Sequence, residues 1–128
     1  MDTREKIIDL ARAAEIADGL RRDGVRLKLV AAYFDVLTPD HVRRLSALAG
    51  GQPLLCAVLD PPHPLLPSRA RAELAAALGV IDYVLLLDGA DLARALEQIQ
   101  PHELIREEAA DSERSQALIE HVHRRQRA

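Results

Sequence analysis

The sequence predicts an α/β fold: one doubly wound, Rossmann-like parallel sheet of four to five strands with helices on both faces. Two observations predict it. Apolar runs of strand length alternate along the chain with amphipathic segments of helix length, and only short connections separate them. The length, 128 residues with 48% hydrophobic side chains, suits one domain with a single modest core. We therefore expect residues 1–128 to form one domain whose strands are joined by right-handed crossovers.

Caps and breakers set the element boundaries. Thr38 followed by Pro39 is typical of an N-cap and a first helical position, and Gly50 is typical of a helix end. Asp111 or Ser112 is expected to open the last helix. We predict helices over residues 3–22, 38–49, 68–79, 91–100 and 112–125, and strands over residues 26–34, 54–59, 81–87 and 103–106.

Composition excludes several classes of partner. The three aromatic side chains and the net charge of −3 offer neither base-stacking platforms nor a field that attracts a polyanion, so we expect no nucleic-acid binding. No run approaches the roughly 20 apolar residues of a membrane helix, so we expect no membrane partner. The single cysteine, Cys56, cannot form an intramolecular disulfide, and we expect a reducing, cytoplasmic location.

Carboxylates follow three predicted strands, which raises the question of a metal or phospho-acceptor site. Asp35, Asp60 and Asp88 stand at these strand ends. A receiver-type domain also needs a lysine at a strand end, and Lys6 and Lys28 lie elsewhere. Side chains two apart on a helix do not face the same side, which excludes the histidines of the last helix as a ligand pair. We therefore expect turn carboxylates and no metal site.

Residues 34–41, which read FDVLTPDH, carry the strongest functional signal. They resemble the F-D-[IL]-L-H-x-G-H signature of the cytidylyltransferase-like nucleotidyltransferases, particularly the adenylyltransferase domain of ADP-heptose synthase. Further resemblance lies in residues 67–71, 79–84 and 99–106, so the similarity is strongest over residues 6–106. It implies a nucleotide site at the carboxyl edge of the sheet, where open α/β folds bind ligands.

The departures from the signature fall in its catalytic part. In the family, the two histidines of HxGH bind the triphosphate and stabilise the transition state, and the glycine lets the backbone approach the phosphates. Here Thr38 replaces the first histidine, Asp40 replaces the glycine, and only His41 remains. Losing one positioned donor typically costs about 10²–10³ in rate. The resemblance therefore implies a degenerate motif, TPDH, and doubtful activity.

The resemblance assigns candidate roles residue by residue. Thr38 and His41 are the residual catalytic candidates. The full set of nucleotide-binding candidates is Phe34, Asp35, Thr38, His41, Arg71 and Arg106. Each has a structural alternative: His41 as a helix-start residue bonded to a nearby loop, Asp35 as a turn brace through backbone N–H groups, and Arg71 as an exposed helix arginine.

Two function hypotheses follow. In the first, the domain is non-catalytic and retains binding of a nucleotide or phosphorylated small molecule, or a role in assembly. In the alternative, it joins a sugar phosphate or similar phosphate to ATP or CTP with release of pyrophosphate, and Mg²⁺ enters with the nucleotide. An unrelated α/β protein remains a third reading. Because the resembling family commonly forms dimers, we also expect a homo-oligomer that uses a helix face.

Overall fold

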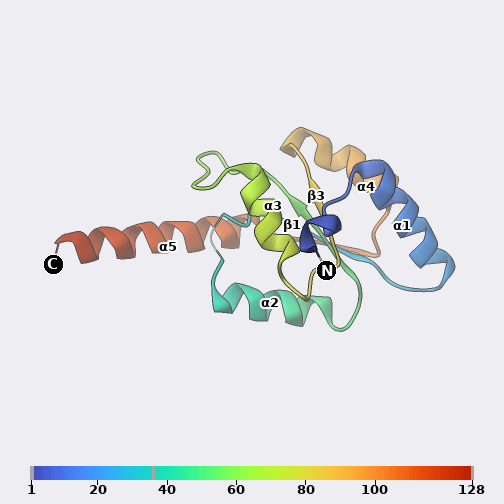
Figure 1. The fold of residues 1–128 in the computed structure, drawn as a ribbon, viewed down its shortest axis with the longest axis horizontal. Helices are drawn as coiled ribbons and strands as arrows, with labels where there is room; N and C mark the ends of the chain where they lie inside the picture. Colours follow the sequence, from blue (N-terminus) through green and yellow to red (C-terminus); the bar gives the residue numbers. More distant parts are fainter. Residues whose placement is uncertain (1, 36, 128) are drawn as a thin grey trace.

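The computed structural model describes residues 2–35 and 37–127 and contains a four-stranded parallel sheet (Figure 1). The strand order is β3-β2-β1-β4, and every pairing is parallel. The strands are β1 (Lys28–Ala32), β2 (Leu54–Val58), β3 (Tyr83–Leu86) and β4 (Glu103–Arg106). This confirms the predicted fold class, at the lower end of the expected strand number.

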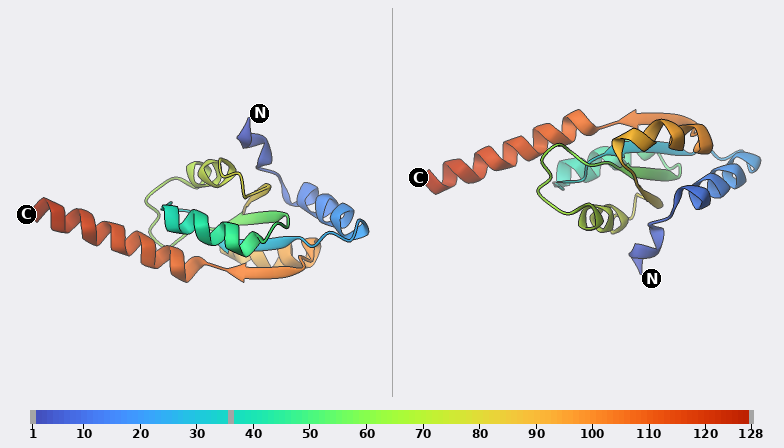
Figure 2. Two further views of the ribbon diagram at one scale, coloured as in Figure 1. Left: turned by 90° about the horizontal axis from the view of Figure 1, so that it is seen from below. Right: turned by 90° about the horizontal axis from the view of Figure 1, so that it is seen from above.

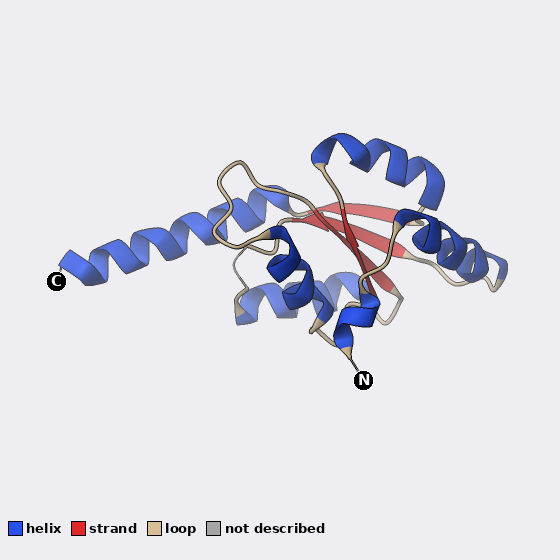
Figure 3. Ribbon diagram, turned by 45° about the horizontal axis from the view of Figure 1, so that its top comes forward, coloured by secondary structure: helices blue, strands red, loops and turns tan. Residues whose placement is uncertain are grey.

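Helices cover both faces of the sheet (Figures 2 and 3). One face packs against α2 (Pro39–Ala49) and α3 (Ser68–Ala76), and the other packs against α1 (Leu10–Arg22) and α4 (Leu92–Ile99). The last helix, α5 (Glu108–Arg127), follows β4 directly and extends away from the sheet (Figure 1). The doubly wound arrangement is thus confirmed, with α5 standing outside the two layers.

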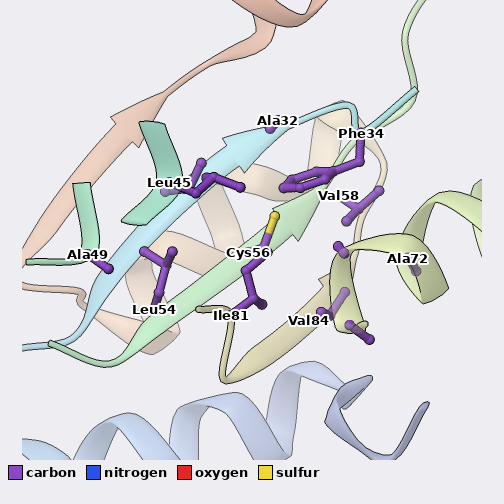
Figure 4. Close-up of a cluster of buried hydrophobic side chains, with 13 residues drawn as sticks. Ala32, Phe34, Leu45, Ala49, Leu54, Cys56, Val58, Ala72, Ile81 and Val84 are labelled. Carbon is purple, nitrogen blue, oxygen red and sulfur yellow. The ribbon is translucent and has the colours of Figure 1, made fainter. Parts of the chain in front are cut away.

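The alternation of side chains along β1 and β2 divides the core into two clusters. Val30 and Cys56 point toward α2 and α3, whereas Leu29 and Leu55 point toward α1 and α4, because successive strand residues face opposite sides. Figure 4 shows the first cluster, in which Cys56 lies among buried aliphatic side chains. Burial raises the pKa of the Cys56 thiol well above its usual value, so this cysteine is a core residue rather than a nucleophile.

Several predicted boundaries are wrong, including the end of α3, which lies at Ala76 rather than at residue 79. The expected helix over residues 3–22 is divided into a 3₁₀ turn, η1 (Thr3–Lys6), and α1, because Ile8 N–H donates to Val84 O (2.9 Å) and ties the intervening chain to β3. The strand expected over residues 26–34 ends at Ala32, since Phe34 turns to a φ of 54°. The last helix begins at Glu108, four residues before the expected 112.

The predicted caps of α2 are confirmed. Thr38 is its N-cap, with the hydroxyl oxygen accepting from His41 N–H (3.3 Å), and Pro39 occupies the first helical position. Gly50 ends the helix with a left-handed φ of 54°, which glycine adopts without strain. Among the described residues, no helix is long and apolar enough to cross a membrane.

Candidate functional site

The end of β1 and the start of α2 bring two predicted site residues together. Phe34 follows β1 with a left-handed φ of 54°, a conformation that is unfavourable for a bulky residue. Its ring stacks on the imidazole of His41, with 5.1 Å between ring centroids and 29° between the planes. The turn and the helix start are therefore joined by two buried rings rather than by an open crevice.

His41 lies in the protein interior. Its exposure is 0%, and its backbone N–H is bound by the Thr38 hydroxyl. On the side away from that cap, Nε2 lies 3.4 Å from a carboxylate oxygen of Asp111. The imidazole thus faces an acidic side chain of the same molecule instead of solvent. The hydroxyl of Thr38 and the ring of His41 both take part in the helix start.

Asp111 is the central residue of this edge, and it comes from α5. Its carboxylate is buried (2% exposed), and Oδ2 accepts from the backbone N–H groups of Tyr33 (2.7 Å) and Phe34 (3.3 Å). Oδ1 accepts from the guanidinium of Arg114 (2.8 Å), one turn further along α5. Asp111 therefore binds the end of β1 to the first turns of α5.

A second acidic residue next to α5 makes a similar link. Glu107 is buried and pairs with Arg44 of α2, and its backbone N–H donates to Ala31 O (2.9 Å). The pairing with Glu107 raises the pKa of Arg44 further above its usual value. No local pattern around Glu107 in the sequence indicates either link, because both partners lie far away along the chain.

Asp35 braces the proline-rich loop that follows β2. Its buried carboxylate accepts from the backbone N–H groups of Leu65 (2.7 Å) and Leu66 (2.9 Å). This is the structural role that the sequence left open beside ligand binding. The loop therefore lies at the same carboxyl edge as the end of β1.

Arg71, a residue of α3, links the chain segments that meet at this edge. It is 1% exposed, which contradicts the expectation of an exposed helix arginine. Nη1 donates to the carbonyl oxygens of Tyr33 (3.0 Å) and Leu59 (2.6 Å), and Nη2 pairs with Asp60. Nε lies 4.0 Å from Asp35. The guanidinium thus connects the ends of β1 and β2 with the loop between β2 and α3.

The remaining motif residues face outward. Asp40 has a side chain that is 84% exposed and pairs with Arg43 one turn further along α2. Arg106 ends β4, is half exposed, and donates to Glu108 (2.7 Å). That pairing raises the pKa of Arg106.

A small cavity of about 200 Å³ lies between the proline-rich loop and α5. Its lining includes Tyr33, Asp35 and His63 on one side and Ser115 and Ile119 of α5 on the other. Pockets that enclose drug-sized ligands are commonly about 300–1,000 Å³, so this cavity is small for a whole nucleotide. Within residues 2–35 and 37–127, no group of three or more His, Cys, Asp or Glu side chains is placed to hold a metal ion.

The chain is similar to part of several longer bacterial proteins. It is 32% identical to the "Bifunctional protein HldE" of Rhodopseudomonas palustris strain TIE-1, over 80% of this chain and 23% of that protein. Bifunctional protein HldE of Methylococcus capsulatus is 29% identical over 80% of this chain and 24% of its own length. That of Nitrobacter hamburgensis is 29% identical over 67% and 20%. No family model matches the chain.

The chain spans less than a quarter of the length of these bifunctional relatives. The matched part is their cytidylyltransferase-like domain, in agreement with the parallel sheet and with the position of residues 34–41 after its first strand. The chain is therefore a relative of the cytidylyltransferase-like domain of bifunctional HldE proteins, that is, a nucleotidyltransferase-like domain.

Proposed function

We propose that this nucleotidyltransferase-like domain does not transfer nucleotides. The observation that supports this most strongly is the burial of His41, the one histidine left at the signature. It lies between the Phe34 ring and the Asp111 carboxylate and has no exposed surface. A group that stabilises a phosphoryl transition state must touch the reacting oxygens. In the described arrangement, a substrate phosphate has no access to the imidazole.

Charge supports the same proposal. A nucleotide triphosphate that reached His41 would meet the Asp111 carboxylate, which lies 3.4 Å from Nε2. Repulsion between like charges at such short range is strong in a buried, weakly screened site. Asp40, at the position of the family glycine, is exposed and pairs with Arg43, so the acid that opposes the family's binding mode is Asp111.

The other candidate residues support a structural edge. Asp35 and Arg71 bind the loop after β2 and the strand ends through backbone groups and Asp60. Their polar atoms are thereby directed into the protein. We infer that the residues at the family positions now hold the fold together. Their donor groups are therefore not positioned to stabilise a transition state.

The retained function, in this proposal, is binding of a phosphorylated small molecule or nucleotide without turnover. Arg44 and Arg106 are half exposed at this edge and pair with Glu107 and Glu108, so a phosphate would compete with these carboxylates for the two guanidinium groups. A role in assembly is the second candidate. It is favoured by α5, which extends from the body and exposes Leu118 and Val122 (43% each).

Turnover is tested with ATP and with CTP, each with Mg²⁺ and a panel of sugar phosphates. We expect no pyrophosphate release above that of the buffer, and no change with His41→Ala. Release that His41→Ala abolishes, while circular dichroism shows an intact fold, would establish the active alternative. Asp40→Ala is the matched control on the same helix turn, because its side chain is exposed.

Assembly is tested by light scattering and sedimentation of the purified chain. We expect a homodimer, in keeping with the expected oligomer, and we expect Leu118→Ser to shift it toward the monomer. Leu74→Ser, an exposed leucine of α3, is the control. A strict monomer at all concentrations leaves ligand binding as the retained function.

A further inference from the structure

We propose that α5 is a displaceable seal over an anion site at the end of β1, and that phosphate-class anions compete with the Asp111 carboxylate for this site. We define the strand-end anion site as the backbone N–H groups of Tyr33 and Phe34. The inference rests on the proposed function, because it places the ligand at the same edge. It adds the control of access.

The donors of this site are arranged for an anion. Tyr33 and Phe34 are successive residues, and both N–H groups are directed at one oxygen, Oδ2 of Asp111, at 2.7 and 3.3 Å. Successive backbone N–H groups that converge in this way form concave anion-binding nests. A carboxylate already occupies this nest, so its geometry and polarity suit an oxyanion. A phosphate oxygen presents the same kind of acceptor with more charge.

The partners of Asp111 differ in what happens to them when α5 moves. Arg114 belongs to α5 and leaves with it. Tyr33, Phe34 and His41 belong to the body and stay. Leaving a buried N–H group without an acceptor is energetically costly. Departure of Asp111 is therefore unfavourable by itself and favourable only when another anion replaces the carboxylate, which makes the two events competitive.

The shape of α5 allows such a movement. Its first turns touch the end of β1, and beyond them the helix extends outside the layers of the sheet and helices (Figures 1 and 2). Leu118 and Val122 are 43% exposed, so the distal part buries little apolar surface. The hydrogen bonds of Asp111 to Tyr33 and Phe34, together with its contact to His41, join the start of α5 to the body.

The test uses inorganic pyrophosphate as the probe and the full chain as the protein. Asp111→Asn keeps the side-chain size but removes the charge that competes with the anion. We expect this variant to bind pyrophosphate at least about tenfold more tightly than the wild type in calorimetry, because the competing state is weakened. In NMR spectra, the amide signals of Tyr33 and Phe34 should shift on titration. Glu113→Gln, with the same charge change on an exposed position of α5, should behave as the wild type.

A second variant tests the proposal even if Asp111→Asn does not fold. Arg114→Gln weakens the hold on Asp111 without removing the carboxylate, and we expect an intermediate gain in affinity. Equal pyrophosphate affinity in wild type, Glu113→Gln and both seal variants, or a gain in affinity that leaves the Tyr33 and Phe34 signals unmoved, would overturn the seal. The readout is binding, not turnover. Pyrophosphate release from ATP by the wild type would refute the proposed function and leave the seal untouched.

Discussion

The two faces of the sheet differ in the kinds of side chain that they bury. Toward α1 and α4, the buried side chains are those of leucine, isoleucine and alanine alone. Toward α2 and α3, the apolar cluster is bordered at the carboxyl edge by the buried polar residues of the described chain: Asp35, His41, Arg71, Glu107 and Asp111. In open α/β sheets, this edge is where ligands commonly bind.

The difference shows how a polar strand edge is stabilised within one molecule. Polar side chains that face a crevice need partners once the crevice closes, because an unpaired buried polar group is costly. In this chain the partners come from the molecule itself. Arg71 takes carbonyl oxygens of the strand ends, and Asp111 takes the strand-end N–H groups. The opposite face needs no such partners, and its stability comes from apolar burial.

The largest effect is expected at the polar edge. Arg71→Ala leaves two strand-end carbonyls and the Asp35 and Asp60 carboxylates without their cation, and removal of one buried partner of this kind costs about 3–5 kcal/mol. Chemical denaturation measures the loss in free energy of unfolding. Arg69→Ala, on the exposed side of the same helix, is the control and should change it by less than about 1 kcal/mol. Equal losses in the two variants would contradict a structural Arg71.

On the apolar face, Leu29→Ala is expected to cost about 3 kcal/mol, because it leaves a cavity in a fully buried cluster. Leu104 is its register partner on β4 and is 37% exposed. Leu104→Ala should therefore cost much less in the same denaturation experiment. Equal losses in the free energy of unfolding would contradict the burial of this face by α1 and α4.

The smallest of the three effects concerns the helix start beside His41. Thr38→Ala removes the oxygen that accepts from His41 N–H, and loss of such an N-cap typically costs about 1 kcal/mol. Thr38→Ser keeps the hydroxyl and should retain most of the stability in thermal unfolding. A loss of the same size with serine would show that the methyl group, and not the cap, is what matters at this position.

The sequence predicted the helices and strands well, but it did not predict the partners of the buried polar residues. Thr38, Pro39 and Gly50 identified α2 correctly, since caps act locally. Arg71 was expected on an exposed helix surface and is buried, because nothing in its helix shows that three chain segments converge on it. Asp111 was expected as a helix cap. Acidic residues are common in the first turn of a helix, so the position of Asp111 in the sequence does not indicate a contact with a distant strand.

Taken alone, the sequence determined the alternation of strands and helices and the two-sided cover of the sheet, because these depend on periodicity and caps. Only the tertiary structure decided that α5 starts directly after β4, that Asp111 thereby reaches the end of β1, and that His41 is enclosed. The physical reason is that these contacts join residues some 70 to 80 positions apart, and such pairings depend on how the crossovers bring the strand ends to one edge.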